Sequence, residues 1–131
     1  MVHHRWLPIC LFMLVATTTA AGAQPASPSK NQCFYINQLE SWRAPDAKTI
    51  YIRVQLDNYY RLDLAGACPA IMWPGSHLIT KTRGPDTVCS AVDWDLSVSE
   101  EPHGIPEPCI VKSMTRLSPR EVAAIPRKFK P

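Results

Sequence analysis

Two aspartates that flank a tryptophan are the first residues in this sequence whose types and spacing could do chemistry. Asp93 and Asp95 stand on either side of Trp94. If this stretch is a strand, residues two apart point to the same face, which places the two carboxyl groups roughly 7 Å apart. Paired carboxylates beside an aromatic ring are found in glycosidases, where their separation decides the stereochemical outcome. Two acids on the solvent face of a strand are far more common, so we expect no catalytic pair here.

Other candidate catalytic or metal-binding residues are few. Beyond residue 23 the histidines are His77 and His103, and no third or fourth metal ligand stands at a suitable spacing. Ser76 follows Gly75, but the segment lacks the second glycine of a nucleophile elbow. The sequence therefore predicts no catalytic residue, no metal site and no cofactor, in a protein that is not an enzyme.

The aromatic residues offer a different kind of site. Tyr51, Tyr59, Trp42 and Trp73 could gather into a patch that binds a ligand. Single exposed aromatics on a small β domain need no such explanation. Both interpretations stay open at the level of sequence.

Residues 1–23 have the pattern of a cleavable secretory signal peptide. Arg5 supplies the positive charge, and the apolar run from Trp6 to Ala16 is short for a membrane span, which needs about 20 residues. Small residues then lead to Ala21-Gly22-Ala23, a triplet that a signal peptidase accepts. We expect cleavage after Ala23, a periplasmic or secreted protein, and no stable membrane span after cleavage.

The chain that remains is small and nearly neutral. Residues 24–32 are rich in Ala, Ser, Pro and Lys and predict a flexible leader, and residues 33–131 are enough for one disulfide-stabilised β domain. Without Arg5, the 14 Lys and Arg residues become 13 against 11 acids. That excess is too small to indicate nucleic acid as a partner, which leaves an unknown protein or a component of the cell envelope.

Four cysteines remain once Cys10 leaves with the signal peptide, and they predict two disulfides. Cys33, Cys68, Cys89 and Cys109 are tens of residues apart, so they form neither a redox CxxC pair nor a zinc knuckle. Three connectivities are possible. We favour Cys68–Cys89, across an intervening edge strand, and Cys33–Cys109, which join the first and last ordered segments.

The clearest secondary structure is a β-hairpin from Ile50 to Leu64. Apolar residues alternate with polar ones on both arms, the period of half-buried strands. A three-residue loop pairs Leu56 with Tyr60 and Val54 with Leu62, which keeps the apolar sides together. The predicted fold is mainly β: an antiparallel meander of about five strands that could curl into a small barrel, with a short C-terminal helix and two disulfides.

The other predicted elements follow from local composition. They are a short strand at 34–36, a turn or short helix at 37–42, a loop at 43–48, an edge strand at 77–83, a long strand at 88–98, a last strand at 109–114 and a helix at 117–125. The helix carries Ser118 as N-cap, Pro119 at its first position and Glu121 to complete a capping box. Such a short helix must dock its Val122 side on the sheet.

Several of these residues together resemble a known family. They are Cys33, Trp42, the Tyr60-x-Leu62-x-Leu64 strand that runs into Cys68-Pro69, Cys89 with Asp93, Cys109, and Leu117-Ser118-Pro119-Arg120-Glu121. In this arrangement the chain resembles a family of small exported proteins of Gram-negative bacteria that is known only as a domain of unknown function. The resemblance implies a periplasmic or secreted bacterial protein and supplies no activity.

Three classes of function remain. We expect a non-catalytic binding or structural module of the cell envelope, because no coherent catalytic set exists. One alternative is an inhibitor of a hydrolase that uses the proline-rich loop at residues 100–108. Another is a small hydrolase that uses Asp93 and Asp95.

Overall fold

The computed structural model describes residues 33–100 and 104–131. The predicted signal peptide at 1–23, the predicted leader at 24–32 and His103 lie outside the described residues. Among the helices that are described, none has the length and apolar character needed to cross a membrane.

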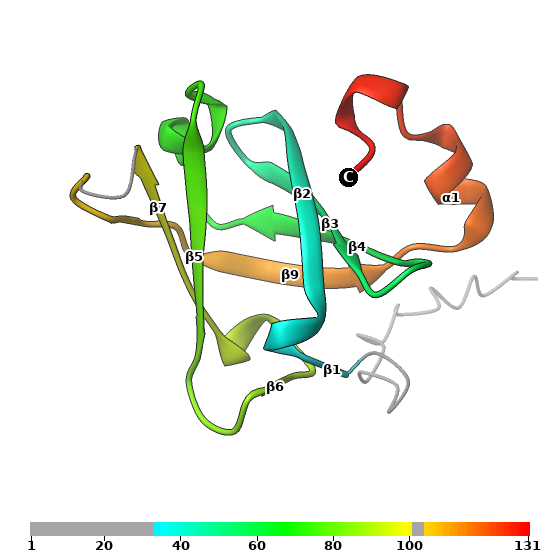
Figure 1. The fold of residues 1–131 in the computed structure, drawn as a ribbon, viewed down its shortest axis with the longest axis horizontal. Coiled ribbons are helices and arrows are strands. Elements are labelled where there is room, and N and C mark those ends of the chain that lie inside the picture. The colour runs from blue at the N-terminus through cyan, green and yellow to red at the C-terminus, as the bar shows by residue number, and fades with distance from the viewer. Residues whose placement is uncertain (1–32, 101–103) are drawn as a thin grey trace, which may run out of the picture.

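A four-stranded antiparallel sheet organises the fold (Figure 1). In spatial order its strands are β2 (Leu39–Asp46), β3 (Thr49–Val54), β4 (Asn58–Leu64) and β9 (Val111–Arg116). Even-numbered residues of β3 and β4, such as Ile52 and Leu62, are buried on one face because side chains alternate along a strand. Odd-numbered residues such as Arg61 point to the opposite face, here called the outer face.

Two smaller antiparallel sheets complete the β structure. One contains β5 (Ser76–Thr82), β7 (Trp94–Glu100) and β8 (Glu107–Pro108) in that order. The other pairs β1 (Phe34–Tyr35) with β6 (Thr87–Val88). The predicted mainly-β antiparallel fold is confirmed, and within the described residues the three sheets do not close into a barrel.

The main core joins all three sheets. Its fully buried side chains are Ile50, Ile52, Val54, Leu62, Val88 and Val98. The Phe34 ring of β1 lies 5.0 Å from the Tyr60 ring of β4 and 6.0 Å from the Trp94 ring of β7, measured between centroids. One aromatic cluster thus connects a strand of each sheet.

Short helical turns connect the strands. They are η2 (Ile36–Gln38), η3 (Pro69–Met72), η4 (Ala91–Asp93) and η5 (Arg127–Phe129), all of 3₁₀ type, with α1 (Pro119–Ala124) as the α-helix. Ser118 caps α1 as predicted: its hydroxyl accepts the Glu121 amide at 3.4 Å and donates to the Glu121 carboxylate at 2.7 Å. The predicted C-terminal helix and its capping box are confirmed.

The C-terminal segment from Leu117 onward covers part of the outer face. The Leu117 amide donates to the Tyr59 carbonyl at 2.8 Å, which ties the segment to the start of β4. Val122 and Ile125 are buried, yet neither belongs to the main core. The chain therefore has a second, smaller apolar cluster on the opposite side of its central sheet.

The β3–β4 hairpin has the predicted loop length and a different register. Three residues, Gln55 to Asp57, connect the arms, but Ile52 pairs with Tyr60 and Val54 with Asn58. The loop lies two residues earlier than predicted, so Leu56 is in the turn and 80% exposed. A shift of two residues preserves which side chains share a face, so alternation alone could not detect it.

Three other segments also differ from the prediction. Residues 39–46, expected to be a turn and a loop, form β2, whose irregular register hides the alternation of a strand. The long strand expected at 88–98 is interrupted by η4, and Val92 is consequently exposed. Pro108, expected to lie in the proline-rich loop at residues 100–108, stands opposite Ser97 at the end of the β7–β8 ladder.

The predicted disulfide connectivity is wrong. The bridges are Cys33–Cys89 and Cys68–Cys109, not Cys68–Cys89 and Cys33–Cys109. In the β1–β6 ladder Phe34 pairs with Val88, so the next residues outward, Cys33 and Cys89, stand opposite each other. The Ala65 amide donates to the Ile110 carbonyl at 2.9 Å, which brings the end of β4 beside Cys109.

Candidate functional site

Asp93 lies in the turn η4 and not on a strand face with Asp95. One of its carboxylate oxygens accepts the Cys89 amide at 2.9 Å, the Ser90 amide at 2.8 Å and the Ser90 hydroxyl at 3.0 Å. The three donors converge on this one oxygen and tie the Asp93 side chain to the two residues that precede η4. The predicted one-face arrangement of Asp93 and Asp95 is therefore incorrect.

The same contacts explain the acidity of Asp93. The hydrogen bond from the Cys89 amide holds the pKa of Asp93 below its ordinary value, against an opposing effect of burial, and the Ser90 bonds add to the lowering. Glu121 behaves similarly, because the Ser118 hydroxyl and amide lower its pKa. Both carboxylates are charged acceptors that stabilise local backbone.

The other candidate catalytic residues do not meet at one place. Asp95 is exposed on β7 opposite Lys81, and His77 is exposed on β5 opposite Ser99. The Ser76 hydroxyl donates to the Trp73 carbonyl at 2.5 Å, a turn contact. Across residues 33–100 and 104–131, no group of three or more His, Cys, Asp or Glu side chains could hold a metal ion.

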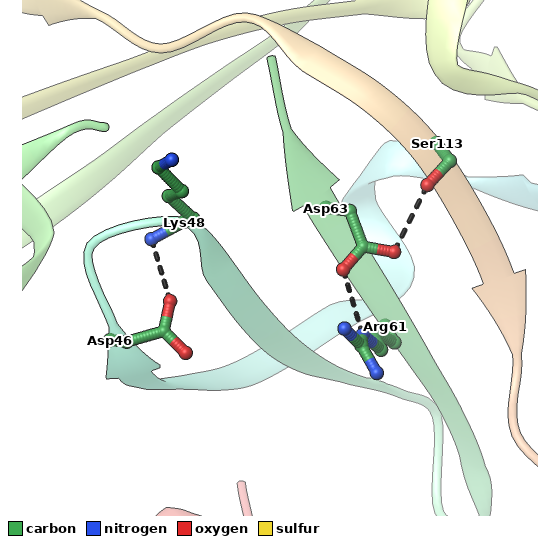
Figure 2. Close-up of polar contacts among 5 residues, drawn as sticks. All are labelled: Asp46, Lys48, Arg61, Asp63 and Ser113. Atoms are coloured by element: carbon green, nitrogen blue, oxygen red, sulfur yellow. Dashed lines mark hydrogen bonds and ion pairs between the residues drawn. The ribbon is translucent and has the colours of Figure 1, made fainter. Parts of the chain in front are cut away.

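A polar cluster lies on the outer face where β4 meets β9. Figure 2 shows Asp63 between Arg61 and Ser113: Arg61 Nε is 2.8 Å from one carboxylate oxygen, and the Ser113 hydroxyl donates to the other at 3.0 Å. Nearby, the Lys48 amide donates to the Asp46 carboxylate at 2.8 Å in the β2–β3 turn. These acids, like Asp93, hold neighbouring parts of the fold together.

Of the four candidate aromatic residues, the structure brings two to one place. Trp42 of β2 and Trp73, which follows η3, both line a hollow of about 250 Å³. Tyr51 and Tyr59 lie elsewhere, against the C-terminal segment. Of the four-residue patch that the sequence left open, the structure shows a two-tryptophan site, here called the tryptophan hollow.

The tryptophan hollow lies between three elements. Trp42 and Arg43 come from β2. Met72 is the last residue of η3, Trp73 follows it, and Ser76 is the first residue of β5. Trp42 packs against the main core, whereas Met72 is 47% and Trp73 43% exposed. The hollow thus has one side, Trp42, that is fixed by the core, and two exposed apolar side chains. Together they form a surface that a partner could cover.

The turn η3 that presents Met72 and Trp73 is firmly attached. The Cys68 amide donates to the Ala47 carbonyl at 2.7 Å, and the Cys68–Cys109 bridge is buried below it. Ala70 and Ile71 of η3 are themselves buried. The exposed pair is therefore held in place before any ligand arrives, which reduces the entropy that binding must remove.

A larger cavity of about 630 Å³ lies beside α1. Its walls include Tyr59, Leu117 and Val122, with Arg116 and Lys130 at its edge. Arg116 donates to the Asn58 side chain, and Lys130 Nζ lies 5.7 Å from the centre of the Tyr59 ring. Both cations have partners within the fold, as does Arg43 of the tryptophan hollow, whose guanidinium donates to the Trp42 carbonyl at 2.9 Å.

Sequence reasoning missed Met72 and Arg43 as members of this site. Met72 lies in a segment that looks like an ordinary turn, and Arg43 lies in one that looks like a loop. The available signal was the closeness of Met72 and Trp73 to Cys68, because a disulfide fixes an apolar turn at the surface. Trp42 and Trp73 themselves were among the predicted residues.

One comparison with known proteins matches nearly the whole chain to a family. A family model described as "Family of unknown function (DUF6491)" matches residues 1–128. No curated protein and no solved structure matches the chain.

Proposed function

The chain belongs to this family of unknown function, and we propose that it is a non-catalytic binding module that acts in the periplasm or outside the cell. Two disulfides are typical of oxidising compartments, and residues 1–23 have the composition of a signal peptide. The signal-peptide composition and the disulfides therefore both support a periplasmic or extracellular location.

The tryptophan hollow is the observation that carries the proposal. Its exposed Met72 and Trp73 are rigidly presented, and aromatic and Met side chains are enriched where proteins bind partners. The acids, by contrast, stabilise the fold: Asp93 accepts three hydrogen bonds and Asp63 two polar contacts. This distribution suits recognition better than hydrolysis, since catalysis needs several titratable groups around one pocket.

A binding experiment tests the proposal. Residues 24–131, immobilised without reducing agent, are exposed to envelope extracts of the source organism, and any retained component is purified and titrated back. We expect Trp73→Ala to weaken its binding at least roughly tenfold, as for a hot-spot residue. Asp95→Ala is the matched control, since Asp95 is exposed on another strand.

Two outcomes would contradict the proposal. The first is binding that Trp73→Ala leaves unchanged. The second is hydrolase activity of the purified protein that Asp95→Asn abolishes while the fold persists. The second outcome would restore the enzyme alternative.

One observation favours the inhibitor alternative. Ile105 is 94% exposed between Gly104 and Pro106, and the chain after it is held by β8 and by the buried Cys109. A rigid segment with an exposed apolar residue loses little entropy when it enters a cleft. If Ile105→Ser, and not Trp73→Ala, abolished binding of an enzyme and relieved its inhibition, the inhibitor assignment would replace the present one.

A further inference from the structure

We infer that the free edge of β5 binds an extended peptide as an added strand, and that an apolar side chain of this peptide fills the tryptophan hollow. The inference rests on the proposed binding function and specifies the ligand class. It follows from the hydrogen-bonding pattern of β5 and from the position of the hollow at the start of that strand.

The pattern of the β5–β7 ladder shows which backbone groups of β5 point away from β7. The Arg83 amide donates to the Asp93 carbonyl at 2.9 Å, which continues the register in which Lys81 stands opposite Asp95. In an antiparallel pair, hydrogen-bonded and non-bonded positions alternate. Odd-numbered residues of β5 therefore bond to β7, and even-numbered residues direct their amides and carbonyls to the other side.

An independent contact supports this assignment. Leu96 of β7 stands opposite Thr80, and its carbonyl accepts the Cys109 amide at 2.9 Å, on the side of β7 remote from β5. Thr80 and Leu96 thus form a non-bonded pair. The backbone groups of Thr80 must point away from β7, as the alternation requires.

These outward groups form an open edge. The Ser76 amide donates to the Trp73 carbonyl at 3.2 Å. Among residues 33–100 and 104–131, no backbone hydrogen bond occupies the outward amides and carbonyls of Leu78, Thr80 and Thr82. Three successive donor–acceptor pairs at strand spacing are what an added strand needs.

The tryptophan hollow lies next to this edge. Ser76 is both the first residue of β5 and part of the hollow, and β2 supplies the opposite wall through Trp42 and Arg43. The turn η3 contacts both β2 and β5, so the hollow that it helps to form lies at the start of β5. Because side chains alternate along a strand, one residue of a bound peptide would face the hollow.

An extended peptide fits this arrangement better than a sugar. A sugar ring can stack on Trp73, but it cannot satisfy amides and carbonyls repeated along a strand edge. In strand addition the main chain gives affinity and a pocket for alternate side chains gives specificity. Lys81 on the edge strand limits unselective pairing with other sheets.

Thr80→Pro tests the edge while it preserves the β5–β7 ladder. Proline lacks the amide hydrogen, and the Thr80 amide points away from β7. Thr80→Val is the matched control because it keeps the amide and the β-branched shape. Thermal unfolding of each variant establishes that the fold is intact.

The probe is a randomised nine-residue peptide library displayed on phage, selected on oxidised protein. We expect the enriched peptides to share one large apolar residue. An enriched peptide, made synthetically, should bind roughly tenfold or more weakly to Thr80→Pro and to Trp73→Ala, but normally to Thr80→Val. N-methylation of alternate backbone amides of the peptide should weaken binding by a similar factor, which keeps the test valid if Thr80→Pro fails to fold.

Several outcomes would overturn the inference. No enrichment, or binding indifferent to N-methylation and to Thr80→Pro, would mean that no strand is added. A dimer of the chain that Thr80→Pro dissociates would make a second copy the occupant. If the envelope component binds Thr80→Pro normally yet is lost with Trp73→Ala, the proposed binding function stands and strand addition fails.

Discussion

Asp93 illustrates how a residue that looks catalytic in sequence can be a structural one. Its carboxylate accepts two backbone amides and a hydroxyl from the two residues before η4. Those bonds hold the chain just after the Cys33–Cys89 bridge. A charged acceptor suits this position because hydrogen bonds to charged groups are stronger than neutral ones.

Replacing Asp93 should therefore reduce stability. We expect Asp93→Ala to lower the free energy of unfolding by about 1–2 kcal/mol, the usual cost of losing a cap. Asp95→Ala should change it by less than about 0.5 kcal/mol, as for an exposed residue. Urea unfolding at neutral pH measures both. Equal effects of the two variants would show that the Asp93 contacts contribute nothing.

The stability that Asp93 contributes should depend on pH. Its pKa is lowered in the folded state from an ordinary value of 3.8, so its contribution is complete above that value and is lost as pH falls through the lower folded-state pKa. The difference in unfolding free energy between the wild type and Asp93→Ala should thus shrink as the pH falls below the ordinary pKa of 3.8. A difference that grew in acid would reverse the sign of the assigned shift.

Some secondary-structure elements could be predicted from local sequence patterns and others could not. The β3–β4 hairpin and the capped helix α1 were predictable, because alternation and capping residues are local signals. The position of the hairpin loop could not be predicted, because Gln55 adopts a positive φ of 54°, which is uncommon for a residue other than glycine. β2 was missed because it is an edge strand with two register irregularities.

The two disulfides should differ in their resistance to reduction. Cys33 is exposed and Cys89 half-buried, whereas Cys68 and Cys109 are 3% and 4% exposed. Mild reductant on the native protein, followed by alkylation and peptide mapping, should label Cys33 and Cys89 first. Prior labelling of Cys68 or Cys109 would mean that η3 opens before the β1–β6 pair.

The capping box should control the helix alone. Ser118→Ala removes the acceptor of the Glu121 amide and should reduce stability by about 1 kcal/mol. Ser118→Asp, which keeps an acceptor, is the matched control. Amide exchange should increase in residues 119–125 and stay unchanged in β4. Faster exchange throughout the sheet would show that the helix is not an independent unit.

The whole molecule has two apolar clusters of unequal importance. The main core connects all three sheets, while Val122 and Ile125 pack on the outer face of the central sheet. Leu62→Ala should therefore cost about 2–5 kcal/mol and destabilise the entire domain. Ile125→Ala should cost less and should raise amide exchange only in the C-terminal segment. Global exchange in both variants would contradict two separable clusters.

The candidate site could be predicted only in part, because its residues are distant in sequence and meet only in the folded chain. Trp42 and Trp73 are visible as aromatic residues in the sequence, but 31 positions separate them, and only the packing of η3 beside β2 unites them. The open edge of β5 is likewise a property of the assembled sheet. The edge-strand character of that segment was predicted and is confirmed, whereas its proximity to the hollow depends on contacts distant in sequence.

The order of the cysteines has a consequence for how the protein is made. The bridges Cys33–Cys89 and Cys68–Cys109 interleave along the chain, so each closes a loop that contains one partner of the other. During synthesis Cys33 and Cys68 become available first, and they are not native partners. If oxidation keeps pace with synthesis, these two thiols join and must later exchange through attack by a third thiolate. The yield of native protein then depends on a disulfide isomerase as well as on an oxidant.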